Sequence, residues 1–486
     1  MTQHLLEHEK SPTADYATGE LAELLAHQAV MYNDDGKKLT YNNLLKGPDS
    51  LLWAAESSKE WDRLIEGTKT LRFVPATAKP HDQRATYVKH VCTDKIKSQG
   101  EMSEKRVRTT VGGDKLDFDG TTAAYTAGLK TVKLLWNAIL STPNARFMTI
   151  DIRNFYLHSR LEKPEYAWVQ LAQIPTATRE KYAVQGLVKD GKVLVEITGG
   201  IYGLPQSGLL AQRDLIKHLE AAGYYMTGTN CLFRHRTRNI TFSLIVDDFG
   251  VMYTREQDAK HLMDTLTAVY EIKFDWTGSR FLGITLDWDY DARSLTTSMP
   301  DFVLKALHRY GYDFSQPPAH SPGGWKKPNY GAAQQLVDDD LTQKLTTEQG
   351  LLLMSIIGTF LWYCRVLDYT GLVAIGQLGQ EVAHPTEHSL DRAHDVLRYF
   401  ATYPSAAVVY KASDMILRIH SDGSYLSEPR AGSRLGAIEY LGSEGDEDLP
   451  PTNGLINVVC CRSDVVLSSA CETEWAAIFK ACKEAV

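Results

Sequence analysis

Two adjacent carboxylates, Asp247 and Asp248, lie in the middle of the apolar stretch F-S-L-I-V-D-D-F-G-V-M-Y, residues 242–253. The runs on either side are rich in β-branched and aromatic residues, which predicts a β-hairpin with the acidic pair at its tip. Neighbouring like charges repel and are costly to desolvate, so a bound cation would explain the pair. A solvent-exposed Asp-Asp turn is the alternative.

A third carboxylate, Asp151, interrupts the strand-like stretch F-M-T-I-D-I at residues 147–152. Charged side chains are unusual inside hydrophobic strands. Asp151 either points to solvent through the alternation of a strand or is buried with a partner and functional. Both interpretations stay open at this point.

Two familiar motifs are rejected by their context. Residues 186–192 spell G-x-x-x-x-G-K, but Val193 replaces the Ser or Thr of a phosphate-binding loop, and a strand follows where a helix is needed. Residues 189–192 are better explained as a hairpin turn. Residues 248–250 spell D-F-G, but the chain has no kinase glycine-rich loop, V-A-I-K strand or H-R-D.

The composition is that of a soluble globular protein, with 486 residues, 43% hydrophobic and 23% charged. Seven cysteines without a C-x-x-C pair argue against a disulfide framework or a zinc finger and favour an intracellular protein. No signal peptide is expected, and the apolar segment 351–364 is too short to span a bilayer, so no membrane partner is predicted. The net charge of −8 requires any nucleic-acid surface to be a local basic cluster, such as the one between Lys89 and Lys115.

The acidic residues need a scaffold, and the hydrophobic periodicity predicts helices alternating with antiparallel strands, an α+β layer. A twisted antiparallel ribbon is expected over residues 71–119, and a Pro- and Gly-rich domain boundary over 316–331. Helices are expected at 20–31, 50–66, 129–140, 209–222, 255–270, 301–310, 347–367, 369–383 and 386–402. Further hairpins or strands are expected at 280–298 and 416–420.

Five segments, in this order, resemble the reverse transcriptases of copia-type LTR retrotransposons. They are D-I-R-N-F-Y-L from Asp151, G-G-I-Y-G-L-P-Q-S from Gly199, I-V-D-D from Ile245, R-F-L-G-I from Arg280 and S-S-A-C-E-T-E-W from Ser468. The resemblance extends over roughly residues 50–486. It implies an α+β fold with a right-hand-like polymerase palm and fingers, a helical connection and an incomplete ribonuclease H-like α/β domain.

The resemblance implies an RNA-directed DNA polymerase that extends a primer 3′-hydroxyl with two Mg²⁺ ions about 4 Å apart. Asp151 and Asp247 would bind both ions, and Asp248 would complete the acidic set. The partners would be an RNA or DNA template with its primer and deoxynucleoside triphosphates.

The resemblance also implies three nucleotide contacts. Tyr156 matches the aromatic residue that excludes a 2′-hydroxyl, and its alternative is a plain core aromatic. Gln206 matches the palm glutamine near the 3′ side of the nucleotide. Arg108 matches the fingers arginine that grips the triphosphate. Arg106 and Lys97 are weaker candidates for the same contact, and surface charge is the favoured explanation for each.

The C-terminal part resembles a ribonuclease H domain, in which Asp422 and Glu474 match the first two acids. The next metal-binding Asp of that family is expected on a later strand, beyond Val486. Little nuclease activity is therefore expected.

The predicted division is an N-terminal extension (1–45), a fingers-like region (46–140), a palm (141–290), a thumb- or connection-like helical region (291–410) and the truncated ribonuclease H-like domain (411–486). The expected location is the cytoplasm or nucleus, or a virus-like particle if the chain is part of an intact element. A catalytically silent nucleic-acid-binding or structural relic is the alternative, because the chain is acidic and Ile245 replaces the usual Tyr before V-D-D.

Overall fold

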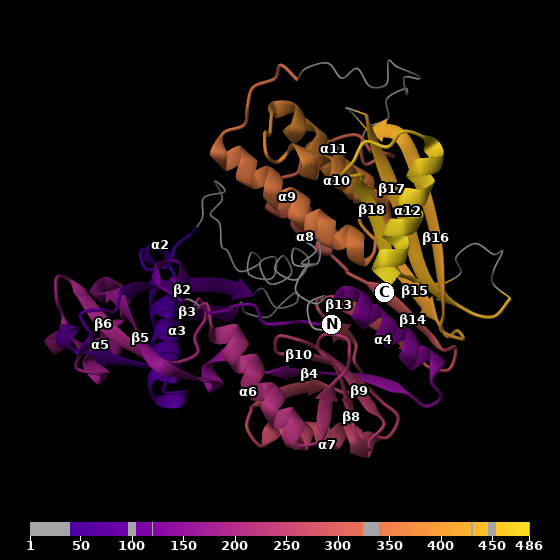
Figure 1. Ribbon diagram of the computed structural model, residues 1–486. Coiled ribbons are helices and arrows are strands. Elements are labelled where there is room, and N and C mark those ends of the chain that lie inside the picture. The colour runs from indigo at the N-terminus through magenta and orange to yellow at the C-terminus, as the bar shows by residue number, and fades with distance from the viewer. Residues whose placement is uncertain are drawn as a thin grey trace, which may run out of the picture.

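The computed structural model describes residues 39–95, 104–118, 120–323, 340–428, 431–445 and 453–485. It is a mixed α+β structure with four sheets (Figure 1). The helix expected at 20–31 and the second half of the predicted connector, residues 324–331, lie outside these ranges.

The N-terminal part contains a five-stranded sheet in the order β1-β6-β5-β2-β3. The strands are β1 (Leu71–Val74), β2 (Ala85–Lys95), β3 (Glu104–Val111), β5 (Arg160–Gln170) and β6 (Lys192–Gly199). β2 and β3 form the predicted antiparallel ribbon, but β1 pairs with β6 instead. The local pattern could not reveal that pairing because the two strands are more than a hundred residues apart.

Three helices accompany this sheet, and they are α2 (Tyr41–Leu44), α3 (Ser50–Asp62) and α5 (Thr176–Lys181). α3 continues into a π-helical turn, Arg63–Gly67, so Gly67 ends that turn rather than capping an α-helix. The predicted hairpin turn at 189–192 is confirmed by reciprocal backbone hydrogen bonds between Lys189 and Lys192.

The central part is a six-stranded antiparallel sheet in the order β11-β4-β10-β9-β8-β7. Its strands are β4 (Arg146–Ile152), β7 (Tyr224–Met226), β8 (Leu232–His235), β9 (Ile240–Ile245), β10 (Asp248–Tyr253) and β11 (Ile272–Asp275). The helices against it are α4 (Leu129–Ser141), α6 (Ser207–Ala221) and α7 (Glu256–Thr267). All of these helices, and the hairpin formed by β9 and β10, were predicted from the sequence.

Strand alternation separates the two faces of this sheet. Phe242 packs on Phe249 and on Tyr224, whose ring in turn contacts His261 of α7. Asp151 shares its face of β4 with Phe147, whose ring contacts Phe281 and Trp288 at 5.8 and 5.3 Å. The carboxylate face is therefore the one directed away from α7.

A four-stranded sheet, β12-β13-β14-β15, adjoins this face. Its strands are β12 (Arg280–Phe281), β13 (Ile284–Asp289), β14 (Ser294–Ser298) and β15 (Ala407–Lys411). β13 and β14 form one hairpin across the boundary predicted at residue 290, and β15 joins from the far end of the predicted helical region. One continuous core includes Phe147, Phe360 and Tyr410, so these regions pack as a unit.

Four helices form the layer at the top of Figure 1. They are α8 (Phe302–Arg309), α9 (Thr347–Val366), α10 (Leu372–Glu381) and α11 (Glu387–Thr402). Among the described residues, α9 alone is long and apolar enough to cross a membrane, with 44% of its most apolar window buried. Phe360 of α9 is fully buried and stacks on Phe400 of α11, as in a core helix of a soluble protein.

The C-terminal part is a three-stranded sheet, β16-β17-β18, with helix α12 (Ala470–Ala485) on it. The strands are β16 (Ile416–Glu428), β17 (Gly432–Gly442) and β18 (Leu455–Arg462). α4 ties this part to the centre of the molecule. Lys130 pairs with the buried Glu439 at 3.0 Å, and Lys133 donates to the Arg365 carbonyl at 3.0 Å and to the Tyr369 hydroxyl at 3.2 Å.

Candidate functional site

The fold brings the three predicted carboxylates to one end of the six-stranded sheet. Asp248 is paired directly with Asp151 in the antiparallel register of β10 and β4, so the two side chains share a face. Asp247 lies in the turn between β9 and β10, and its carbonyl accepts from the Ile152 amide at 3.0 Å. All three side chains are half-buried.

The turn that presents Asp247 is held in an unusual backbone conformation. Val246 has a φ of 60°, in the left-handed region that a β-branched residue rarely adopts. Such residues cost on the order of 1–3 kcal/mol and persist where the surrounding structure imposes them. The flanking strands impose it here, because Ile245 and Asp248 must pair across a two-residue turn.

Burial and mutual repulsion perturb this acidic set. Burial, followed by the charge of Asp151, raises the pKa of Asp247 to about 6, against an opposing effect of Arg108. Burial and the charges of Asp247 and Asp151 raise the pKa of Asp248 to about 7. Together these carboxylates hold more negative charge than their surroundings neutralise near neutral pH.

The donor set fits a hard divalent cation. None of the three carboxylates has an ion-pair partner in the described part of the chain, and Arg108 acts on Asp247 only through its field. Mg²⁺ takes carboxylate oxygens as ligands, and its charge would remove the repulsion. Across the described ranges no three His, Cys, Asp or Glu side chains already converge as a closed metal cage, so these carboxylates are neighbours rather than a preformed cage.

Arg108 and two aromatic residues, Tyr202 and Tyr156, lie beside the carboxylates. The guanidinium of Arg108 on β3 lies over the ring of Tyr202 at 5.0 Å, and that ring meets Tyr156 edge to face at 5.3 Å. Burial, followed by the charge of Asp247, raises the pKa of Tyr156 to about 12. Arg108 and Tyr156, predicted separately, thus come together beside Asp247.

The loop at residues 199–207 packs with its backbone directly against β3 and the Tyr156 turn. Gly203 has a φ of 95°, and a Cβ there would meet the Val111 carbonyl oxygen at 1.9 Å. A Cβ on Gly200 would meet the Tyr156 carbonyl oxygen at 2.2 Å. These glycines therefore allow β3, the Tyr156 turn and the loop to meet with backbone in contact.

Gln206 follows in the same loop, with its side chain 8% exposed. Its Oε1 atom is buried and has no hydrogen-bond partner. A buried acceptor left unpaired is costly, and it marks a place where a bound group could donate.

The second predicted acidic pair, Asp422 and Glu474, lies on the C-terminal sheet and α12. The Gly423 amide donates to Glu474 Oε2 at 3.1 Å, and a Cβ on Gly423 would lie 2.7 Å from the Thr473 backbone. β16 and α12 therefore cross closely at Gly423, next to Asp422 in the strand. Both side chains are exposed.

Three features of the site were missed by sequence reasoning. Tyr202 stands in the quoted G-G-I-Y-G-L-P-Q stretch, so a signal was present. Lys273 pairs with Asp151 in the register of β11 and β4, and no local pattern reveals that. Arg106, expected to be a surface charge, is half-buried, and burial together with Arg108 and Arg63 lowers its pKa. Lys97 lies outside the described residues.

The sequence matches no protein-family model and no curated protein. Among solved structures, a foamy viral protease-reverse transcriptase in complex with double-stranded DNA is similar, with a TM-score of 0.43 and 12% sequence identity. The alignment covers 100% of this chain and 74% of that chain. A likeness at this level decides nothing about this chain, so the functional argument rests on the site itself.

Proposed function

We propose that the chain is an RNA-directed DNA polymerase of the copia type, with the six-stranded sheet as its palm and the five-stranded sheet as its fingers. The observation that carries the proposal is the convergence of Asp151, Asp247 and Asp248 with Arg108 and Tyr156. A buried, self-repelling acidic set beside an unpaired guanidinium suits a nucleotide bound together with divalent cations.

In this proposal Asp151 and Asp247 hold two Mg²⁺ ions, and Asp248 adds negative charge behind them. The bound metals would activate the primer 3′-hydroxyl and stabilise charge on the triphosphate. Arg108 is the group that meets the triphosphate, because a guanidinium presents a planar fork of donors to phosphate oxygens. Its cation–π contact with Tyr202 fixes the side chain before the nucleotide arrives.

Tyr156 and Gln206 would determine how the sugar is bound. The Tyr156 ring is held by Tyr202 on one side and by Phe155, whose ring lies at 5.7 Å, on the other. A ring held in this way can exclude a 2′-hydroxyl by contact alone. The unpaired Oε1 of Gln206 is buried, so it would accept from the nucleotide only if binding exposes it.

The test is primer extension on an RNA template with Mg²⁺, comparing the wild-type chain with Asp247→Asn. The wild type should extend the primer and the variant should not, with both folded by circular dichroism. Equal incorporation by the two proteins would contradict the proposal. A DNA template run in parallel measures template preference.

The second candidate is a nucleic-acid-binding relic without catalysis. It is favoured by the buried Ile245 that precedes V-D-D and by the overall acidic charge. Salt-dependent binding of an RNA–DNA hybrid with no extension at high protein concentration would support it. The ribonuclease H-like pair is expected to contribute little nuclease activity in either case.

We place the protein inside the cell, in the cytoplasm or nucleus, or in a virus-like particle if the chain is part of an intact element. No membrane partner is part of the proposal.

A further inference from the structure

A buried carboxylate lies at the outer edge of β3, the strand that carries Arg108. β3 is an edge strand, bonded only to β2, so alternate backbone amides point outward without a strand partner. Glu60 of α3 supplies the missing acceptor, with its Oε1 2.9 Å from the Thr109 amide. The Glu60 side chain is 5% exposed.

The same carboxylate is paired with Arg63, in the π-helical turn that follows α3. Arg63 also donates from Nη1 to the Asn154 side-chain oxygen at 2.6 Å. Asn154 has a φ of 56° and begins the 3₁₀ turn Phe155–His158, which contains Tyr156. Glu60 and Arg63 therefore connect the Arg108 strand to the Tyr156 turn through three consecutive hydrogen bonds.

Positive charge is in excess around Glu60. Arg106 and Arg108 lie on one face of β3, and both act on Glu60 through their charges, as Arg63 does. Within the described residues neither Arg106 nor Arg108 has a carboxylate partner within 4 Å, and Arg108 Nε is buried without a hydrogen bond. Three guanidiniums and one carboxylate make a half-buried cluster that a polyanion would neutralise.

We propose that Glu60 and Arg63 are positioning residues that hold a two-arginine phosphate receptor, Arg106 and Arg108, in register with the turn carrying Tyr156. The proposal rests on the polymerase function for its substrate, a nucleoside triphosphate. Arg106 joins Arg108 as a phosphate contact, and Glu60 aligns both by fixing the backbone directly after Arg108, at Thr109. Arg63 transmits that alignment to the sugar side of the site through Asn154.

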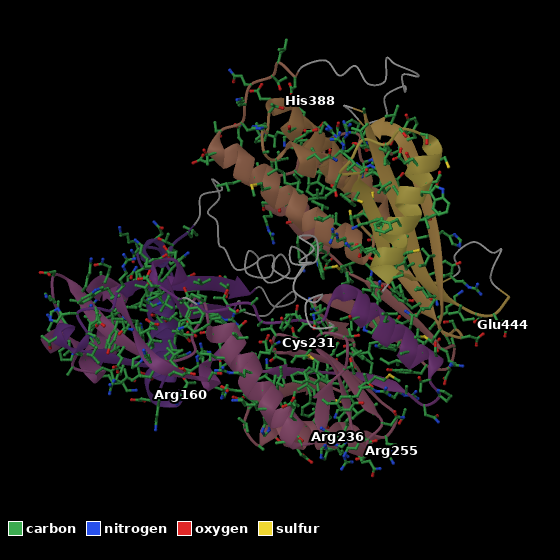
Figure 2. All side chains as sticks on the ribbon, in the orientation of Figure 1. Arg160, Cys231, Arg236, Arg255, His388 and Glu444 are labelled. Carbon is green, nitrogen blue, oxygen red and sulfur yellow. The ribbon has the colours of Figure 1, made fainter. Side chains whose placement is uncertain are left out.

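The first experiment measures binding of inorganic tripolyphosphate by calorimetry without metal or template, using the full chain. Simple electrostatics predicts that Glu60→Ala binds more tightly, because it removes a negative charge from the cluster. Positioning predicts the opposite, about tenfold weaker binding, because Glu60→Ala also removes the acceptor of the Thr109 amide and the arginines lose their alignment. Arg106→Ala should also weaken binding, whereas Arg236→Ala, on the distant hairpin end labelled in Figure 2, should not.

The second experiment uses Asn154, where a matched pair of variants keeps the left-handed backbone accessible. Asn154→Gly removes the acceptor for Arg63, and Asn154→Asp retains it. In primer extension, Asn154→Gly should lower the preference for deoxynucleotides over ribonucleotides about fivefold or more, with Asn154→Asp close to wild type. A purely structural contact would lower the melting temperature without changing that preference.

The outcomes separate this proposal from the polymerase function. If the wild type extends a primer, two results together would overturn the positioning role and leave the polymerase intact. They are unchanged discrimination in Asn154→Gly and unchanged or tighter tripolyphosphate binding in Glu60→Ala. If the wild type never extends a primer but Glu60→Ala binds tripolyphosphate more weakly than the wild type does, the receptor is supported and the polymerase is overturned. If Glu60→Ala fails to fold, the Asn154 pair decides.

Discussion

The molecule holds two sets of acids on two sheets, and their surroundings differ. Asp247 and Asp248 are half-buried, repel each other and Asp151, and have raised pKa values. Asp422 and Glu474 lie on β16 and α12, which cross closely at Gly423, and both side chains are exposed to solvent. Exposed acids are screened by water, so the C-terminal pair has much less need of a cation.

The difference shows that acidic residues become a reactive site through what surrounds them. The first set is bordered by Arg108, Tyr202 and Tyr156. In the described part of the chain, the hydrogen bond found at the second set is the one from the Gly423 amide to Glu474. The comparison predicts that matched substitutions in the two sets have very different consequences.

The largest expected effect is on catalysis. Asp248→Asn should reduce primer extension by roughly three orders of magnitude or more, because it removes charge at the centre of the proposed metal site. Asp422→Asn, the same chemical change in the exposed set, should leave extension unchanged. Single-nucleotide incorporation rates for both variants check the prediction, and similar losses in the two would refute the distinction.

The same pair of variants should differ in stability. The pKa of Asp248 is raised from an ordinary 3.8 to about 7, so the folded state binds its proton more tightly and stability is lost as pH rises from about 4 to about 7. Asp248→Asn cannot ionise and should be more stable than wild type at pH 8 by on the order of 3 kcal/mol without divalent metal. At pH 4 the two should be nearly equal.

Urea unfolding in EDTA at both pH values measures this difference, with Asp422→Asn as the control. Asp422→Asn should follow wild type at each pH. If the wild type is as stable as Asp248→Asn at pH 8, the ionised carboxylates do not destabilise the folded state by repelling one another.

Arg108 should affect substrate binding more than turnover. Arg108→Ala should raise the KM for deoxynucleotides roughly 10- to 50-fold, the loss of one charge-assisted contact of about 1.5–2.5 kcal/mol. Arg236→Ala removes the same charge from an exposed position and should change KM less than twofold. Steady-state kinetics with varied nucleotide concentration measure both KM values. Equal changes in KM for Arg108→Ala and Arg236→Ala would show that Arg108 contributes only to the overall charge of the protein.

The smallest effect concerns α4, which joins the two regions. Burial lowers the pKa of Lys133 from an ordinary 10.5 to about 7, so the unfolded chain binds more protons above pH 7 and stability rises with pH there. Between pH 7 and 8.5 the free energy of unfolding of the wild type should rise by about 1.5 kcal/mol relative to that of Lys133→Met. Chemical denaturation of both proteins at the two pH values measures this difference. A difference in stability that does not change with pH would show that the protonation of Lys133 is not coupled to folding.

Much of the local structure could be predicted because short periodic patterns of hydrophobic residues determine it. The β9–β10 hairpin, α4, α6 and α7 were all expected from alternation or helical spacing. The pairing of β1 with β6 and the joining of β15 to β14 were not, because strands distant in sequence pair through tertiary packing. The boundary predicted at residue 290 falls inside the local hairpin of β13 and β14, in the stretch 280–298 where hairpins or strands were expected.

The candidate site divides in a similar way. Asp151, Asp247, Asp248, Arg108 and Tyr156 could be named from motifs, and the fold brings them to one end of the sheet. Gln206 could be named in the same way, and it lies in the loop that follows Tyr202. Glu60 and Lys273 could not, since their relation to the site depends on which edge α3 covers and on the register of β11. Arg106 was misjudged because a basic residue in a charged run gives no sign of its burial.

The most direct test of the carboxylate site is single-turnover incorporation of one deoxynucleotide on an RNA template while Mg²⁺ is titrated, for wild type and Asp247→Asn. We expect saturable, Mg²⁺-dependent incorporation by the wild type and none above background by Asp247→Asn at any Mg²⁺ concentration. Incorporation by Asp247→Asn at the wild-type rate, or by the wild type in EDTA, would contradict the account.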